Sequence, residues 1–211
     1  MPSNKKCLRS ADLYLILDRE VNSYDELWEI LKESARCGVG VVQLRDKFGS
    51  ALDILKFTQK AQQFLRGRIP FIVNDRVDLA LASGASGVHL GQEDLSVAFA
   101  RRILGKDALI GVSCQNFKHA LKAQKEGADY IGLGSVFKTQ TKPDRSAMDL
   151  KLLESVAAKI KIPLFAIGGI TAEKIYLIRR LGIGRVAVCR EICLARSVRK
   201  AVLNLKEALR G

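Results

Sequence analysis

Short apolar runs alternate with longer amphipathic stretches along this chain of 211 residues. The runs are rich in Val, Ile and Leu and are apolar at nearly every position, which is typical of strands buried on both faces of a parallel sheet. The pattern predicts eight strands, at Leu13–Leu17, Val39–Leu44, Phe71–Val73, Gly87–Leu90, Leu109–Val112, Tyr130–Leu133, Pro163–Ile167 and Arg185–Val188.

Between these runs, apolar residues recur at helical spacing. Ser50 stands where an N-cap is expected, and Gly38, Gly127 and Gly182 stand where a left-handed C-cap favours glycine. Helices are predicted at Tyr24–Cys37, Ser50–Arg66, Asn116–Glu126, Leu150–Lys159, Ala172–Leu181 and Ser197–Leu209.

Strands that alternate with helices predict an α/β fold, a single (β/α)₈ TIM barrel forming one domain over residues 1–211. An open doubly wound sheet is the alternative, and the missing GxGxxG after the first strand is a weak argument against it. The hydrophobic fraction of 48% excludes the disordered class. No apolar run approaches the roughly 20 residues that a membrane helix needs. We therefore expect a cytoplasmic protein with no membrane partner.

The five cysteines are interpreted as reduced thiols. Cys189 and Cys193 could share a helical face, but no further Cys or His nearby completes a zinc site. The formal net charge is +13, which raises the alternative of a nucleic-acid-binding protein. Aromatic residues are only 6%, however, and the basic residues are spread through the helices. We therefore expect a solvated basic surface that attracts anionic molecules weakly, and no specific nucleic-acid partner.

Polar side chains follow most of the predicted strands, and in a barrel of this kind the carboxyl ends of the strands form the active site. Arg45, Lys47 and Lys142 supply positive charge at these ends, and such side chains bind phosphate. Asp75 and Asp94 supply two carboxylates. Two carboxylates combined with substrate phosphates form a typical Mg²⁺ site, because this ion prefers hard oxygen ligands.

Each of these residues also has a purely structural interpretation. Asp75 and Asp94 could cap helices, and the glycines at 168–169 could form a tight turn rather than an anion site at a helix N-terminus. Five strand ends carry such chemistry at one rim, and this convergence favours a site for phosphate and metal. His89 is interpreted as a buried structural histidine, and His119 as a surface residue on a helix.

Several segments together resemble the thiamine-phosphate synthase family over essentially the whole chain. The combination of NDRVDLAL, GVHLGQEDL, TxTK and IGGI is specific, whereas each piece alone is not. The matching segments are VQLRDK (Val42–Lys47), FIVNDRVDLAL (Phe71–Leu81), GVHLGQEDL (Gly87–Leu95), IGVSCQN (Ile110–Asn116), YIGLGSVFKTQTK (Tyr130–Lys142) and PLFAIGGI (Pro163–Ile170).

The resemblance implies a barrel enzyme that couples 4-amino-2-methyl-5-hydroxymethylpyrimidine diphosphate with 4-methyl-5-(2-hydroxyethyl)thiazole phosphate. It implies a dissociative reaction assisted by Mg²⁺ on Asp75 and Asp94, with Lys47, Ser113 and Lys142 acting in catalysis. The residues implied to bind the pyrimidine diphosphate are Gln43, Arg45, Lys47, Asn74, Ser113 and Lys142, and Leu44 and Asp46 beside them are implied to bind substrate. Those implied to bind the thiazole phosphate are Thr139, Gln140, Thr141, Gly169, Cys189 and Arg190. The partners are then small phosphorylated substrates, and a homo-oligomer is compatible with the sequence.

Some positions depart from the family pattern. Asp46 stands where the family usually has Glu, and Ser135 and Lys138 replace common prolines. Cys189 and Arg190 stand where Ile-Ser is common, so a phosphate contact there would use the backbone. The rival interpretation is a thiazole tautomerase, which resembles this family but carries a histidine soon after the serine of the fifth strand. No such histidine occurs here before His119.

Overall fold

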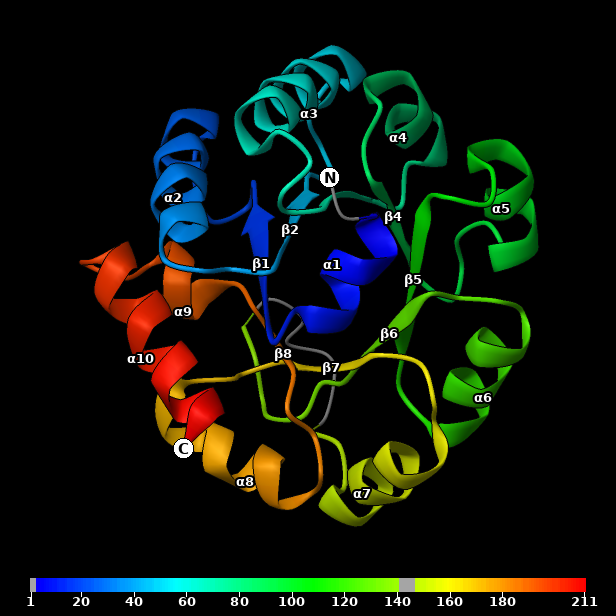
Figure 1. The fold of residues 1–211 in the computed structure, drawn as a ribbon, viewed down its shortest axis with the longest axis vertical. Coiled ribbons are helices and arrows are strands. Elements are labelled where there is room, and N and C mark those ends of the chain that lie inside the picture. The colour runs from blue at the N-terminus through cyan, green and yellow to red at the C-terminus, as the bar shows by residue number, and fades with distance from the viewer. Residues whose placement is uncertain (1–2, 141–146) are drawn as a thin grey trace.

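The computed structural model describes residues 3–140 and 147–211. In this part of the chain eight parallel strands close into a barrel in sequence order, with the last strand paired to the first, and helices surround them (Figure 1). This confirms the predicted TIM barrel. The strands are β1 (Leu13–Asp18), β2 (Val41–Arg45), β3 (Phe71–Asn74), β4 (Gly87–Leu90), β5 (Leu109–Cys114), β6 (Tyr130–Leu133), β7 (Leu164–Ile167) and β8 (Val186–Val188).

The helices follow the strands with two additions, α1 before the barrel and α9 before α10. The described α-helices are α1 (Asn4–Ser10), α2 (Tyr24–Arg36), α3 (Ala51–Leu65), α4 (Val77–Ser83), α5 (Val97–Leu104), α6 (Phe117–Lys125), α7 (Leu150–Lys159), α8 (Ile175–Arg180), α9 (Arg190–Cys193) and α10 (Val198–Arg210). A 3₁₀ turn at Ala172–Lys174 precedes α8, so the continuous helix predicted at Ala172–Leu181 is interrupted. The sequence pattern did not predict α1, α4, α5 and α9, because helices of four to eight residues contain too few turns for a periodic signal.

Local signals at the helix ends are confirmed. The Ser50 side chain accepts a hydrogen bond from the backbone N–H of Asp53, so it is the N-cap of α3. Gly38, Gly127 and Gly182 have φ angles of 94°, 87° and 80°. This left-handed region costs glycine little, and it lets the chain turn from a helix toward the next strand.

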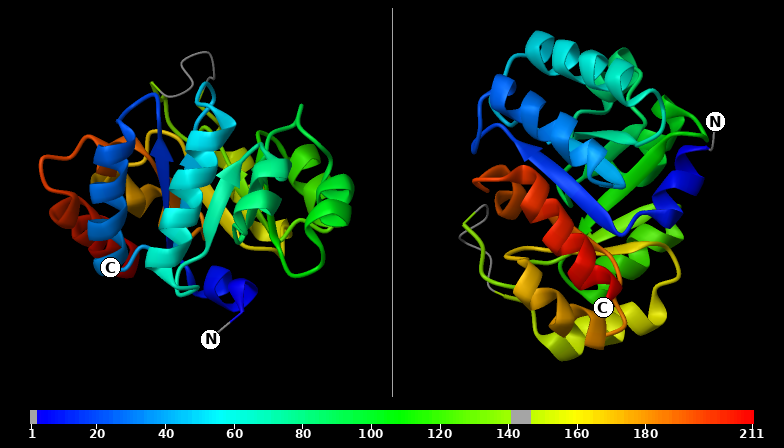
Figure 2. Two further views of the ribbon diagram at one scale, coloured as in Figure 1. Left: turned by 90° about the horizontal axis from the view of Figure 1, so that it is seen from above. Right: turned by 60° about the vertical axis from the view of Figure 1, so that its left-hand side comes forward.

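Helix α1 closes the N-terminal end of the barrel. It lies below the strands in the left view of Figure 2, and Leu8 in α1 packs against the cluster that fills the barrel interior. The larger apolar cluster lies between the strands and the surrounding helices. The N-terminal end is therefore filled, which leaves the C-terminal ends of the strands to form a site.

Three aromatic rings fill the middle of the barrel. The ring centroids of Tyr14 and Phe165 are 5.4 Å apart, those of Tyr130 and Phe165 are 5.9 Å apart, and those of the two tyrosines are 5.8 Å apart. Gly111 in β5 makes room for them, because a Cβ atom there would lie 2.0 Å from Cζ of Tyr130. The interior is thus a packed core, and its upper layer becomes the floor of the site.

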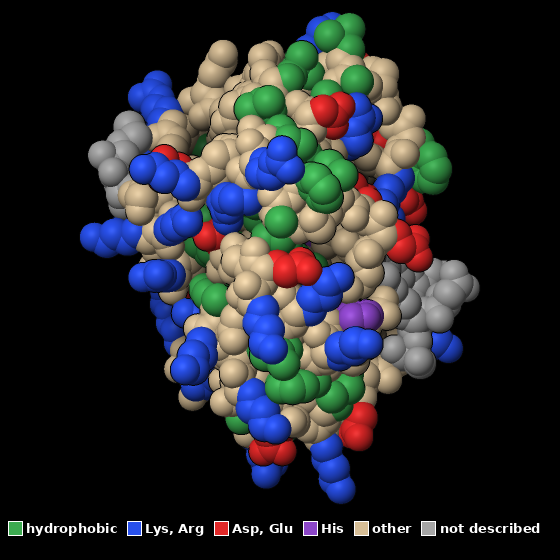
Figure 3. All heavy atoms as spheres, turned by 90° about the vertical axis from the view of Figure 1, so that its right-hand side faces the viewer, with side chains coloured by type: hydrophobic (Ala, Val, Ile, Leu, Met, Phe, Trp, Pro, Cys, Tyr) green, Lys and Arg blue, Asp and Glu red, His purple; other side chains and the backbone are tan. Residues whose placement is uncertain are grey.

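On the face drawn in Figure 3, the basic side chains do not gather in one patch. Figure 3 shows Lys and Arg side chains scattered over one face among acidic, apolar and uncharged groups. This distribution is typical of a solvated basic surface rather than of a recognition stripe. Among the described residues, no helix has the length and apolar character that a membrane crossing requires.

Replacing Gly111 with Ala tests the packing of the barrel interior. We expect Gly111→Ala to lower the free energy of unfolding by about 1–3 kcal/mol, because the new methyl group overpacks the buried Tyr130 ring. Gly184→Ala is the matched control, since a Cβ atom there meets no atom within 4 Å, and its effect should stay within about 0.5 kcal/mol. Urea denaturation of both variants measures this difference, and equal unfolding free energies would contradict the packing.

Candidate active site

A cavity of about 780 Å³ opens at the C-terminal ends of the strands. Every strand contributes to its wall, so residues far apart in the chain meet there. Twelve predicted site residues line it: Gln43, Arg45, Lys47, Asn74, Asp75, Asp94, Ser113, Thr139, Gln140, Gly169, Cys189 and Arg190. Thr141 and Lys142, also predicted, lie outside the described residues. Most of the strand-end residues selected from the sequence therefore lie together in this one cavity.

Leu44 and Asp46 do not line the described cavity, in contrast to the sequence-based expectation. Alternate residues of a strand face opposite sides, and Leu44 packs into the layer between the barrel and the helices. The Asp46 carboxylate accepts hydrogen bonds from the Tyr24 hydroxyl at 2.7 Å and from the backbone N–H of Gly49 at 2.6 Å. Burial opposes its charged form, but these bonds lower the pKa of Asp46 overall. Asp46 thus shapes the loop after β2.

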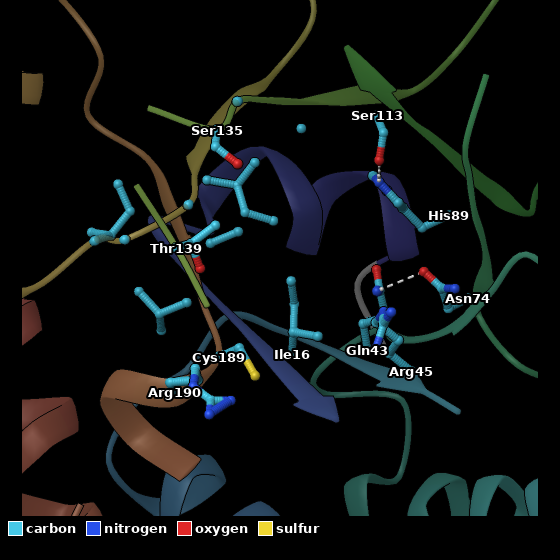
Figure 4. A pocket seen from close by; sticks show the side chains of 18 of the residues that line it. Ile16, Gln43, Arg45, Asn74, His89, Ser113, Ser135, Thr139, Cys189 and Arg190 are labelled. Atoms are coloured by element: carbon cyan, nitrogen blue, oxygen red, sulfur yellow. Dashed lines mark hydrogen bonds between the residues drawn. The ribbon is translucent and has the colours of Figure 1, made fainter. Parts of the chain in front are cut away.

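The cavity has two sides with different chemistry. Figure 4 shows Gln43, Asn74, His89 and Ser113 together on one side, and Ser135, Thr139, Cys189 and Arg190 on the other. Ile16 lies between the two groups. The first group is polar and linked by hydrogen bonds. The second is formed by the loop after β6 and the segment after β8.

A chain of hydrogen bonds runs beneath the polar side. Gln43 Nε2 donates to Asn74 Oδ1 at 3.1 Å, and Tyr14 donates to Gln43 Oε1 at 2.8 Å. The hydroxyls of Tyr14 and Tyr130 are 2.9 Å apart, and Tyr130 lies 3.2 Å from His89 Nδ1. The His89 Nε2 atom is 3.0 Å from the Ser113 hydroxyl, which completes the chain at the cavity wall.

His89 is buried, as expected, but it also lines the cavity. His119 was expected on the surface, and this expectation is wrong: it is half-buried and lines the cavity as well. The reason is that α6 begins at Phe117, directly beyond the end of β5, so its first turn faces the cavity. A helical periodicity alone does not tell which turn of a helix meets the barrel rim.

Arg45 is anchored by two carboxylates. Its Nη1 atom lies 2.8 Å from Asp18 Oδ2 and 2.8 Å from Glu20 Oε1. Burial by itself would lower the pKa of Arg45, but Asp18 and Glu20 raise it overall. Asp18 is 1% exposed, so this pair is shielded from solvent. Arg45 is therefore a fixed positive charge in the wall rather than a mobile side chain.

Asp75 and Asp94 form a carboxylate pair at the cavity mouth. Asp75 has a φ of 61°, a left-handed conformation that a non-glycine residue seldom adopts, and its backbone N–H donates to His89 O at 2.8 Å. Asp94 accepts from the backbone N–H of Gly91 at 2.6 Å. Burial and the neighbouring Asp75 raise the pKa of Asp94, while the Lys47 ammonium, which forms an ion pair with Asp75, opposes that shift.

This pair fits a divalent cation. Two carboxylates that repel each other are relieved by positive charge between them, and both supply the hard oxygen ligands that Mg²⁺ prefers. Within residues 3–140 and 147–211, no group of three or more His, Cys, Asp or Glu side chains is gathered as a metal site. The remaining ligands would have to be water or the oxygens of a bound phosphate.

The glycines after β7 allow close packing of the opposite side. Gly168 and Gly169 have φ angles of 102° and 61°. A Cβ atom on Gly168 would lie 2.7 Å from that of Ser135, and one on Gly169 would lie 2.5 Å from the Lys138 carbonyl oxygen. The glycine turn therefore brings the loop after β6 against β7. Glycine is therefore required at both positions for steric reasons, in addition to any role in an anion site.

Several lining residues were missed by sequence reasoning. Lys174 lies 5.0 Å from the centre of the Phe137 ring and donates to Gly169 O at 3.3 Å. Gln92 Nε2 donates to the backbone oxygen of Ser113 at 2.6 Å. Lys174 follows the end of β7 by seven residues, beyond the reach of the strand-end rule. Gln92 follows β4 by two residues, closer than Asp94, so the rule reaches it, but its amide suggested no phosphate or metal chemistry. Lys138, next to the predicted Thr139, carried a similar signal.

The Cys189 thiol forms part of the wall beside the Cys193 thiol. A hydrogen bond with Cys193, together with burial, raises the pKa of Cys189 well above its usual range. Burial similarly raises the pKa of Cys114 to about 12. Both cavity thiols are therefore neutral at physiological pH, and neither is a ready nucleophile.

The family match, the curated relatives and one solved structure agree on one family. Residues 13–192 match the family described as thiamine monophosphate synthase. The chain is 40% identical over 202 residues to thiamine-phosphate synthase of Clostridium botulinum, covering 92% of each chain. It is 41% identical over 196 residues to that of Methanobrevibacter smithii, again covering 92% of each. The solved thiamine phosphate pyrophosphorylase from Pyrococcus furiosus superposes with a TM-score of 0.86 at 34% identity, covering 98% of this chain and 96% of that one.

The anchoring of Arg45 predicts a difference between buried and exposed ion pairs. We expect Asp18→Asn to lower the free energy of unfolding by about 1–3 kcal/mol, because it weakens charge-assisted hydrogen bonds in a shielded place. Asp78→Asn removes the carboxylate from the exposed pair with Arg76 and should cost less than about 1 kcal/mol. Chemical denaturation at neutral pH measures both. A larger loss for Asp78→Asn would refute the anchoring role of Asp18.

Proposed function

We propose that the chain, which belongs to the thiamine monophosphate synthase family, is a transferase that makes thiamine phosphate. It would couple 4-amino-2-methyl-5-hydroxymethylpyrimidine diphosphate with 4-methyl-5-(2-hydroxyethyl)thiazole phosphate and release diphosphate. The observation that carries this proposal is one cavity that holds a polar floor, a carboxylate pair with a lysine, and a separate side near Thr139 and Gly169. That arrangement suits two phosphorylated substrates held together.

The proposed bond changes need little acid–base catalysis. The C–O bond between the pyrimidine methylene and the diphosphate breaks, and its electron pair leaves with the diphosphate. The resulting carbocation is stabilised by the aminopyrimidine ring, and the lone pair of the thiazole nitrogen then forms the new C–N bond. No proton has to leave the nitrogen, so the enzyme's main tasks are to stabilise the leaving group and to hold the two fragments in line.

The residues divide between these tasks. Gln43, Asn74 and Ser113 would hold the pyrimidine ring over the polar floor. Lys47 and the fixed Arg45 would stabilise the charge that develops on the diphosphate. The other phosphate would be bound on the opposite side, by Thr139 and Gln140 with the backbone at Gly169 and at Cys189–Arg190. Lys138 and Lys174 add positive charge to the same side.

Asp75 and Asp94 would hold Mg²⁺. When bound, this ion supplies positive charge that neutralises the leaving diphosphate. Lys47 now contacts Asp75, and a lysine that shares its carboxylate partner with a metal is set free to reach a phosphate oxygen. The Arg45 side chain stays with Asp18 and Glu20 and therefore keeps its position.

A second candidate is proton transfer on a thiazole, as in the related tautomerases. His119 favours it, because this histidine lines the cavity and its buried Nδ1 has no hydrogen-bond partner within the described residues. The coupling reaction has no use for such a base. Isomerisation of a thiazole phosphate in the absence of any pyrimidine substrate would identify this second activity.

Purified protein with both substrates and Mg²⁺ should form thiamine phosphate. Each molecule of product should appear with one molecule of diphosphate, because the C–O bond that breaks is the one replaced by C–N. Chromatographic detection of thiamine phosphate, alongside a diphosphate assay, measures both. If folded protein makes no thiamine phosphate at any Mg²⁺ concentration, the proposed function is wrong.

Removing one carboxylate tests the metal assignment. We expect Asp94→Asn to lower kcat by about 100-fold or more, because transition-state charge on the diphosphate loses its counterion. Asp107→Asn is the matched control, since it makes the same change at an exposed position before β5, at the other end of the barrel. Circular dichroism checks that both variants fold. A rate for Asp94→Asn close to that of the control would remove Asp94 from the metal site.

A further inference from the structure

The hydrogen-bond chain beneath the cavity has a direction. Gln43 donates through Nε2 to Asn74, so its Oε1 atom accepts the Tyr14 hydrogen. A phenol has one hydrogen to give, so the Tyr14 oxygen must accept the hydrogen of Tyr130. The hydrogen of Tyr130 is then already donated to Tyr14, so the Tyr130 oxygen must accept a hydrogen bond from His89 Nδ1.

The direction continues to the cavity wall. A neutral imidazole that carries its hydrogen on Nδ1 has an acceptor at Nε2, and this atom faces the Ser113 hydroxyl. The Ser113 hydrogen is therefore directed toward His89. Both tyrosines are at most 2% exposed, and burial raises the pKa of each. Both hydroxyls thus keep their hydrogens and remain links of the chain.

We propose that this one-way chain fixes the donor and acceptor pattern that the floor presents to the pyrimidine ring, with Tyr14, Tyr130 and His89 as positioning residues. The inference rests on the proposed function. Asn74 is held with its oxygen toward Gln43, which leaves its amide N–H groups for a ligand. Ser113 is held with its hydrogen toward His89, which leaves its oxygen lone pairs for a ligand.

That pattern suits an amino-substituted ring. The ring nitrogens of a 4-aminopyrimidine accept hydrogen bonds, while the amino group donates them. A 4-oxo analogue replaces the amino donor by an acceptor and turns one ring nitrogen into a donor. A floor whose polarity is fixed therefore discriminates against the oxo ring, because a mismatched buried group is left unpaired.

The two ends of the chain are coupled through the tyrosines. Turning the Asn74 amide around requires Gln43 to turn as well, and Gln43 would then donate to Tyr14. The Tyr14 and Tyr130 hydrogens would have to reverse together. Removing one hydroxyl in the middle breaks this coupling, and each end can then adopt either orientation. Specificity would be lost without any change in a residue that lines the described cavity, since neither tyrosine does so.

The tautomer of His89 tests the chain without any substrate. The protein has two histidines, so ¹⁵N NMR at pH 8 can resolve both, and His119→Asn assigns the signals. We expect His89 to carry its hydrogen on Nδ1, and Tyr130→Phe to weaken that preference. A wild-type His89 with its hydrogen on Nε2, or on both nitrogens, overturns the chain.

Substrate discrimination tests the consequence. The ratio of kcat/KM for the 4-amino substrate to that for its 4-oxo analogue should fall about tenfold in Tyr14→Phe and in Tyr130→Phe. Phe165→Leu is the control, because this ring packs on both tyrosines without a hydrogen bond, and its ratio should stay at the wild-type value. An unchanged ratio in both tyrosine variants, or an equal fall in Phe165→Leu, overturns the positioning role.

These readouts separate the two proposals. Wild-type protein that makes no thiamine phosphate overturns the proposed function, and with it the specificity claim, whatever the tautomer of His89. If the wild-type protein couples the substrates but the imidazole hydrogen of His89 is on Nε2, only the proposed hydrogen-bond chain is overturned.

Discussion

The interior of an eight-stranded barrel is too narrow for water to hydrate polar side chains, and this constraint organises the site. A buried hydroxyl or amide must find a partner within the protein or leave a costly unpaired group. Tyr14 and Tyr130 meet this requirement through each other. Gln43 and His89 extend the pairing to both sides. Gly111 makes it possible, because only a missing side chain on β5 leaves room for the Tyr130 ring.

The charged side chains at the cavity rim are also positioned by the need for a partner where solvent is excluded. Arg45 is surrounded by protein and keeps two carboxylate partners, so it is fixed. Lys47 is more exposed and pairs with a carboxylate that a cation would also attract. On the face drawn in Figure 3, by contrast, Lys and Arg side chains are scattered among other groups. In the proposed function, a few charges held at strand ends would therefore bind the anionic groups of the substrates, while the rest would give a background field.

The sequence predicts the barrel well because buried parallel strands leave a strong local signal. Each of the eight apolar runs overlaps an observed strand, although β1, β2, β3 and β5 each extend one or two residues beyond the predicted run, into polar positions such as Asp18, Arg45 and Asn74. Strand ends also locate most of the site. The pattern fails to place a side chain whose position depends on tertiary packing. The Asp46 carboxylate bonds within the loop after β2, and His119 reaches the cavity rim only because α6 starts beside the end of β5. The pairing of Tyr14 with Tyr130 joins positions 116 residues apart, and no local spacing encodes it.

In our proposal, the polarity of one buried chain of hydrogen bonds fixes the donor and acceptor pattern at the floor of the cavity. Neutron diffraction from a deuterium-exchanged crystal locates the atoms on which this depends. We expect a deuteron on Nδ1 of His89 and none on Nε2, with the Tyr130 deuteron directed at Tyr14 and the Tyr14 deuteron directed at Gln43. A deuteron on Nε2 of His89, with that of Tyr130 directed at Nδ1, would contradict it.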